Sequence, residues 1–222
     1  MRRYDVIEEV YKFNQNHDRR GRFSSSRGGG GTGHKSSYLT ENFGANPETY
    51  GKVAKDLKVD ESEAKRLVKG IWTFSGNLYP NVRAGSTGES KVFQEDADAC
   101  EKFIEKSPKW SGGQLHRGIH VDKNVAEEML RRVRNNEPID MRGLSSWSSN
   151  PKIAMRFAKT QKRSGVSVIF HTNNTATSHG TSISHLSQYP YQKEVLMSNK
   201  SVFTPTKVVQ QGKIIHIYGD MP

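Results

Sequence analysis

The sequence predicts an α+β fold in which helices come first and short strands follow. Helical periodicity dominates residues 60–108, whereas short strand-like runs bounded by turn residues dominate the chain after residue 112. Only two helical segments interrupt the strand-rich part, too few for the regular alternation of helix and strand in a doubly wound parallel sheet.

Before the first strand, two helices are expected. One covers residues 60–76, where Asp60 is a candidate N-cap and Glu63 lies three residues later, as in a capping box. Its apolar residues recur at helical spacing and define one buried stripe. The second covers residues 95–108 and ends at Pro108.

The remaining elements are separated by turns. Strands are expected over residues 112–121, within 138–149, and over 166–172, 193–198, 201–211 and 212–220. A helix over 124–138 stops before a proline, and another over 150–165 begins with Asn150 as N-cap and Pro151 at its first position. Residues 173–192 are expected to form a polar loop.

The N-terminal region differs in composition from the rest. Residues 1–13 have apolar spacing typical of a short helix, and residues 14–37 are rich in Gly, Ser and Arg. The second segment has too few apolar residues to offset its chain entropy, so we expect a flexible basic linker before a domain over 38–222. The linker is interpreted as a tether, with nucleic-acid contact by its arginines as the alternative.

Composition narrows the classes of partner and cofactor. The net charge of +11 favours phosphate-rich or acidic partners, although weak binding of polyanions in general explains it equally well. The lone Cys100 excludes an internal disulfide, and His116 and His120 would need further ligands to bind zinc, so no metal is expected. Neither a secretory signal nor an apolar run of membrane-spanning length is present, so no membrane association is expected.

Two of the expected strands carry side chains suited to an anionic ligand. Arg117 offers a fork of five donors that suits phosphate, and Gly118 beside it permits close backbone approach. Strand alternation puts Ser146 and Ser148 on one face and Trp147 on the other, an arrangement that can orient a carboxylate. The alternatives are a solvated arginine and a plain serine-rich turn.

A lone acid, Glu194, stands at the start of another expected strand. Gln192 lies two residues earlier, so both side chains should point the same way. Glycoside cleavage usually needs two carboxylates, but one suffices to bind a ribose hydroxyl and stabilise an oxocarbenium-like centre. The amide of Gln192 could then hold an amide-like or nucleobase nucleophile.

Taken in order, these segments resemble the Arg–Ser–Glu class of mono-ADP-ribosyltransferases, which includes cholera-like and clostridial Rho-modifying toxins. Three strand segments match: Leu115 to Gly118, Ser146 to Ser148 and Gln192 to Leu196. Ala154, Phe157 and Ala158 match in the helix that follows the serine strand, and residues 71–83 show a further likeness upstream. The resemblance implies N-terminal helices followed by two small, packed, mostly antiparallel sheets that enclose an NAD⁺ cleft.

The resemblance also implies roles. Arg117 would anchor the phosphate and ribose of NAD⁺. Ser146 would orient Glu194 by a hydrogen bond, and Ser148 would support the strand. Glu194 would stabilise the oxocarbenium ion as nicotinamide leaves. The expected NAD⁺ contacts are His116, Arg117, Gly118, Ser146, Trp147, Ser148 and Phe157. The toxins clamp NAD⁺ with an Arg and a Phe that are missing here after the strand over 166–172, where His171 or Asn173 could substitute.

The acceptor would be recognised by Tyr189, Tyr191 and Gln192. In this family, glutamine at the position of Gln192 goes with asparagine targets or guanine bases, and glutamate goes with arginine. We favour a protein acceptor, through an Asn or Gln side chain before Arg, with a nucleobase of DNA or RNA as the alternative. Water as the acceptor, and a non-enzymatic DNA-binding phage head protein, are the other hypotheses.

Residues 13–23 resemble a short segment of phage minor head proteins. This likeness implies a phage or prophage effector that is associated with the virion or acts in the host cytoplasm. A monomer is expected.

Overall fold

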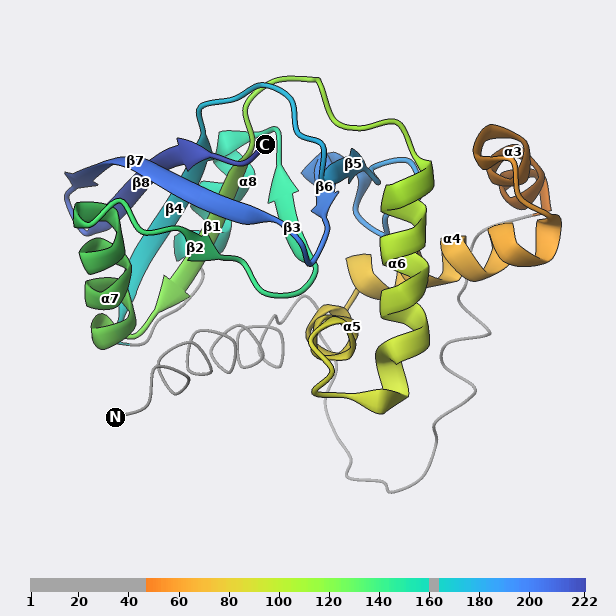
Figure 1. Ribbon diagram of the computed structural model, residues 1–222, viewed down its shortest axis with the longest axis horizontal. Coiled ribbons are helices and arrows are strands. Elements are labelled where there is room, and N and C mark those ends of the chain that lie inside the picture. Colours follow the sequence, from red (N-terminus) through yellow and green to blue (C-terminus); the bar gives the residue numbers. More distant parts are fainter. Residues whose placement is uncertain (1–46, 160–163) are drawn as a thin grey trace.

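The computed structural model describes residues 47–159 and 164–222, and it places a group of helices beside a sheet (Figure 1). The expected helix over 1–13 and the linker over 14–37 lie outside these residues. Along the described chain, helices come first and strands follow, interrupted by two further helices. The predicted α+β class is therefore confirmed.

The helical part contains two helices that were not expected. The helices are α3 (Pro47–Leu57), α4 (Glu61–Ser75), α5 (Tyr79–Ser86), α6 (Gln94–Lys106), α7 (Lys123–Arg134) and α8 (Pro151–Lys159), and the 3-10 turns are η1 (Lys91–Phe93) and η2 (Pro190–Gln192). Sequence reasoning missed α3 and α5, which are short and include Gly or Pro. α3 packs on α4, and α5 packs on both α4 and α6, so tertiary contact stabilises helices that local propensity alone does not.

The start of α4 agrees only in part with the expected capping box. Asp60 Oδ1 accepts a hydrogen bond of 2.8 Å from the backbone N–H of Glu63. The Glu63 carboxylate does not reach back to the cap but forms ion pairs with Arg66 at 2.7 Å and Lys102 at 2.6 Å. These pairs lower the pKa of Glu63 to about 2 and tie α4 to α6.

The strands form one continuous hydrogen-bonded order, β2-β7-β8-β4-β1-β3-β6-β5. Their bounds are β1 (His116–Val121), β2 (Ile139–Asp140), β3 (Ser145–Ser148), β4 (Val166–Thr172), β5 (Gly180–Ser182), β6 (Glu194–Met197), β7 (Val202–Gln211) and β8 (Ile214–Asp220). All neighbouring pairs are antiparallel except β4 with β8. This agrees with the expected mostly antiparallel pairing.

The two expected small sheets are joined rather than separate. β1 and β3 meet at one register pair, His116 opposite Ser148, beyond which the two strands diverge. Five strands lie on one side of this junction and three on the other. The divergence opens a space between β1 and β3 in the middle of the sheet, and the candidate site lies there.

Opposite faces of the sheet pack on different helices. Trp147 faces the core beneath α7, where its ring stacks on Phe203 at 6.0 Å and contacts Phe170. On the other face, α8 crosses directly over β1, and its Ala154 carbonyl lies against Gly118. α8 rests mainly on β1 and has fewer contacts with the serine strand β3.

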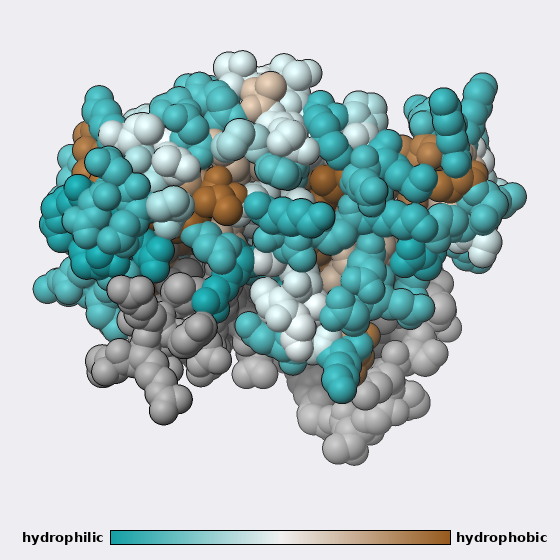
Figure 2. Space-filling view, in the orientation of Figure 1, coloured by the Kyte–Doolittle hydropathy of each residue, from teal (hydrophilic) through white to brown (hydrophobic). Residues whose placement is uncertain are grey.

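Hydrophilic residues cover most of the face shown in Figure 2, and apolar groups appear there only in small separate patches. Large apolar side chains that are exposed on the described chain include Val92 and Tyr191. None of the described helices combines the length and the hydropathy needed to cross a bilayer.

Candidate active site

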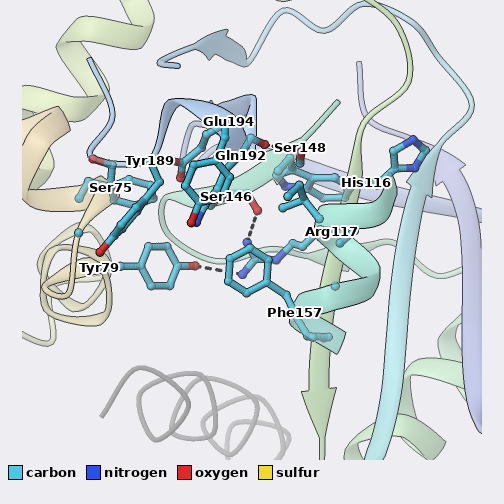
Figure 3. Close-up of a pocket in the computed structure, with 18 of the residues that line it drawn as sticks. Ser75, Tyr79, His116, Arg117, Ser146, Ser148, Phe157, Tyr189, Gln192 and Glu194 are labelled. Atoms are coloured by element: carbon cyan, nitrogen blue, oxygen red, sulfur yellow. Dashed lines mark hydrogen bonds between the residues drawn. The ribbon is translucent and has the colours of Figure 1, made fainter. Parts of the chain in front are cut away.

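A cavity occupies the divergence between β1 and β3 (Figure 3). Its walls come from β1, β3, α8, the turn between α4 and α5, and the η2 turn that leads into β6. The NAD⁺ and acceptor contacts expected from the resemblance all line it, apart from the suggested clamp residues: His116, Arg117, Gly118, Ser146, Trp147, Ser148, Phe157, Tyr189, Tyr191, Gln192 and Glu194. Folding thus brings the three motifs to one place, although the roles assigned to these residues stay predictions.

Arg117 is buried in the wall of the cavity, where its guanidinium group donates to neutral oxygens. Its Nη1 donates to the carbonyl oxygen of Ser146 at 2.6 Å, and its Nη2 donates to the hydroxyl of Tyr79 at 3.1 Å. Within residues 47–159 and 164–222, no carboxylate forms an ion pair with it. A buried guanidinium held only by neutral oxygens attracts an anionic ligand strongly.

Ser148 fixes the turn that carries the amide of Gln192. Its Oγ donates to the carbonyl oxygen of Gln192 at 2.6 Å and accepts from the backbone N–H of Asn150 at 3.0 Å. It also lies directly opposite Glu194 in the register of β3 and β6. One hydroxyl therefore connects the serine strand, the start of α8 and the turn before the acid.

Glu194 opens β6 and is only 4% exposed. Burial raises the pKa of this carboxyl group to about 7, while hydrogen bonds from Ser146 and Ser187 and the charge of Arg117 oppose the shift. The Ser187 hydroxyl donates to Oε2 at 3.3 Å. A carboxylate in this environment is costly to ionise, and its charge therefore acts strongly on a nearby positive centre.

The expected strand geometry of Gln192 and Glu194 was wrong. Gln192 belongs to the η2 turn, and Lys193 between them adopts a left-handed conformation with φ of 48°. Both side chains line the cavity because the chain turns at Lys193, not because they alternate along one strand. The Ser148 contact to the carbonyl of Gln192 holds this turn in place.

Sequence reasoning missed the residues that dock the recognition turn, residues 183–192, on α4. The backbone N–H of Gln188 donates to Ser75 Oγ at 3.0 Å, and its side-chain amide donates to the carbonyl of Trp72 at 2.9 Å. The hydroxyl of Tyr79, which accepts from Arg117, was also missed. Tyr79 lies in the segment 71–83 that resembles the family, and this likeness was the available signal.

The suggested substitutes for the missing NAD⁺ clamp do not reach the cavity. Asn173 donates its side-chain amide to Thr206, and His171 lies between two other histidines. Neither of them lines the cavity. In the described part of the chain, no three His, Cys, Asp or Glu side chains form a group that could hold a metal ion.

The raised pKa of Glu194 predicts a dependence of stability on pH. Between its ordinary value of 4.5 and about 7, the folded protein keeps a proton that the unfolded chain has lost, so this group makes folding less favourable as the pH rises. Glu194→Gln is therefore expected to raise the free energy of unfolding at pH 8 by roughly 3 kcal/mol and to change it little at pH 4.5. Urea unfolding of both proteins at the two pH values measures this, and an equal difference at both would contradict the burial of the charge.

One protein-family model matches the chain. Residues 93–220 match the family described as ART, NAD:arginine ADP-ribosyltransferase. No curated protein sequence matches the chain.

Solved structures share the fold at low sequence identity. An inhibitor complex of Vis, the ADP-ribosyltransferase toxin of Vibrio splendidus, is 18% identical with a TM-score of 0.54 and covers 83% of this chain and 89% of its own. HopU1 of Pseudomonas syringae pv. Tomato DC3000 is 11% identical with a TM-score of 0.59 and coverages of 80% and 83%. Exoenzyme S of Pseudomonas aeruginosa, solved with human 14-3-3 protein beta and carba-NAD, is 19% identical with a TM-score of 0.57 and coverages of 82% and 84%.

These structures support the fold, and the sequence match covers more than half of the chain. The expected fold and NAD⁺-dependent activity are thereby confirmed. The chain belongs to the NAD:arginine ADP-ribosyltransferase family and is an enzyme that transfers ADP-ribose from NAD⁺.

Proposed function

We propose that the enzyme transfers ADP-ribose to an uncharged nitrogen, with the side-chain amide of Asn or Gln in a protein as the favoured acceptor. The supporting observation is the charge of the cavity. Among its described lining residues, Glu194 is the one carboxylate, and Gln192 contributes a neutral amide. Arginine stays protonated in proteins and needs a carboxylate partner to bind here, so a cationic acceptor is disfavoured next to Arg117.

The proposed reaction uses three groups of this chain. Arg117 binds phosphate and ribose oxygens of NAD⁺, and Glu194 accepts a hydrogen bond from a hydroxyl of the nicotinamide ribose. The glycosidic bond breaks, nicotinamide leaves with its electron pair, and the positive charge on the ribose is stabilised by the Glu194 carboxylate. The acceptor nitrogen, held by Gln192, then bonds to C1′ and releases its proton to solvent.

A nucleobase is the second candidate acceptor. The rings of Tyr189 and Tyr191 pack edge to face at 6.1 Å beside the cavity, and Tyr191 is 54% exposed. Exposed aromatic rings can stack on a base, and the net charge of +11 attracts nucleic acid.

We propose a host component as the target in either case, because the similar structures include toxins and a type III effector. Delivery in a phage particle is a further part of this proposal, supported by the likeness of residues 13–23 to minor head proteins.

Labelling of a bacterial lysate with biotinylated NAD⁺ tests the acceptor. We expect label that survives nuclease and disappears with protease. Label with the opposite sensitivity would move the proposal to a nucleobase. Free ADP-ribose without a labelled macromolecule would identify water as the acceptor and contradict transfer.

Gln192→Glu provides a sharper test of acceptor charge. The wild-type enzyme is expected to ignore agmatine, a small guanidine, because Glu194 is the one carboxylate among the described lining residues and none remains to hold a cationic acceptor. The new carboxylate should raise transfer to agmatine by roughly 10-fold or more, as a charge-assisted pair replaces a neutral contact. Nicotinamide release with and without agmatine measures the change, and Lys193→Gln in the same turn is the control. Efficient agmatine modification by the wild type would overturn the preference for a neutral acceptor.

A further inference from the structure

Three histidines from three strands form a hydrogen-bonded row that starts in the cavity. His116 Nδ1 on β1 lies 2.8 Å from His171 Nδ1 on β4, and His171 Nε2 lies 2.9 Å from His216 Nδ1 on β8. The ring planes of His171 and His216 are nearly parallel with centroids 5.2 Å apart, as expected for two rings joined edge to edge, and Tyr218 stacks on His171 at 4.6 Å. Only His116 of this histidine row lines the cavity.

All three rings of the histidine row are neutral at pH 7. Burial lowers the pKa of each of them, and the neighbouring histidines help to lower that of His171 to about 4. A neutral imidazole carries one proton, and each N–N contact uses one. His171 can therefore donate to only one neighbour, so both hydrogen bonds must run in the same direction along the row.

The far end of the row favours one direction. His216 Nε2 is buried and has no hydrogen-bond partner among the described residues. If the bonds run from His216 towards His116, this nitrogen carries no proton, and no buried N–H is left without an acceptor. Because His216 Nε2 is buried, the row does not pass a proton to solvent. Its effect is to fix which ring nitrogen of each histidine carries the proton.

With that direction, the proton of His116 resides on Nε2. This is the one nitrogen of His116 that the row does not engage. NAD⁺ brings phosphate oxygens, which accept hydrogen bonds but do not donate them. A histidine that contacts them helps only if it presents an N–H.

We propose that His116 donates from Nε2 to a phosphate oxygen of NAD⁺, and that His171 and His216 are positioning residues which keep the proton on that nitrogen. This inference rests on the proposed binding of NAD⁺ in the cavity. It assigns to β4 and β8, which contribute nothing to the cavity lining, a part in dinucleotide binding.

His171→Phe tests the proposal, because phenylalanine keeps the stacked ring and removes both hydrogen bonds. We expect the KM for NAD⁺ to rise roughly 5- to 10-fold with kcat changed less than about twofold, the effect of weakening one hydrogen bond. His179→Phe makes the same replacement outside the cavity and the row, and should leave both constants unchanged. An unchanged KM in His171→Phe would overturn the proposal.

A double-mutant cycle separates positioning from a structural effect. The amide of Gln donates without any choice of tautomer, so in a His116→Gln background the further change His171→Phe should alter KM by less than about twofold. A merely structural role of His171 predicts the same loss in both backgrounds, and that result would contradict the inference.

The tautomers are also directly observable. In protein labelled with ¹⁵N-histidine and saturated with carba-NAD, long-range ¹H–¹⁵N spectra should show His116 protonated on Nε2 and His171 and His216 on Nδ1. A proton on Nδ1 of His116 in that complex would overturn the inference. Calorimetry of the wild-type protein separates failure of the proposed NAD⁺ site from failure of this inference. Absence of NAD⁺ binding would refute the site itself, whereas normal binding with the wrong tautomer of His116 would refute only the proposed role of the histidine row.

Discussion

Glu194→Gln is expected to lower the rate of ADP-ribose transfer by roughly 10³-fold or more while the protein still folds and binds NAD⁺. The amide has the same shape as the carboxylate but no negative charge. Glu194 is 4% exposed, and at such a depth little solvent screens its effect on the positive ribose centre. Nicotinamide release at saturating NAD⁺ measures the rate, and calorimetry measures binding.

The rate measurement needs a control variant and a suitable assay pH. Glu127→Gln removes an exposed carboxylate on α7, far from the cavity lining, and should keep the wild-type rate. The pH at which Glu194→Gln is assayed should exceed 7, because the wild-type carboxyl group is protonated below its raised pKa. A variant that retains more than about a tenth of the wild-type rate would exclude Glu194 as the catalytic carboxylate.

Gly118→Ala is expected to lower the free energy of unfolding by about 2–4 kcal/mol and to reduce activity as well. A Cβ at this position would lie 1.8 Å from the carbonyl oxygen of Ala154 and 2.9 Å from the backbone nitrogen of Ala158. Both atoms belong to the backbone of α8, so no side chain can rotate away and the helix itself must move. Because Ile153 and Phe157 of α8 line the cavity, the same shift should widen it and weaken the proposed binding of NAD⁺.

Urea unfolding and the KM for NAD⁺ test this prediction together. Gly51→Ala on α3 is the matched control, since a Cβ there meets no atom within 4 Å and a helical alanine adds up to about 1 kcal/mol of stability. Wild-type stability in Gly118→Ala would show that α8 does not rest on β1 as described.

The helices and strands that carry the site follow from local sequence patterns. The periodicity of residues 60–76 and 124–138 corresponds to α4 and α7, and the alternation around Arg117 and Trp147 corresponds to β1 and β3. Such patterns are readable because one face of each element is buried, which imposes a period on its apolar residues. The helices α3 and α5 were missed because packing on their neighbours, not periodicity, stabilises them.

The turn before Glu194 shows where local reasoning failed. Residues 193–198 look like one strand, yet Lys193 is left-handed because Ser148, 44 positions earlier in the chain than Gln192, holds the preceding carbonyl. The histidine row was equally hidden. Its members are 55 and 45 positions apart, and only the pairing of β1 with β4 and of β4 with β8 makes them neighbours.

The sequence by itself determined the kinds of chemical group and their order: an arginine strand, a serine strand and a glutamate that opens a third. The tertiary structure alone decided that β1 and β3 diverge to form a cavity, that burial raises the pKa of Glu194, and that Tyr79 and Ser187 join the site. The physical reason is the range of the forces. Backbone propensity and side-chain alternation act over a few residues, whereas burial and strand register depend on contacts between distant parts of the chain.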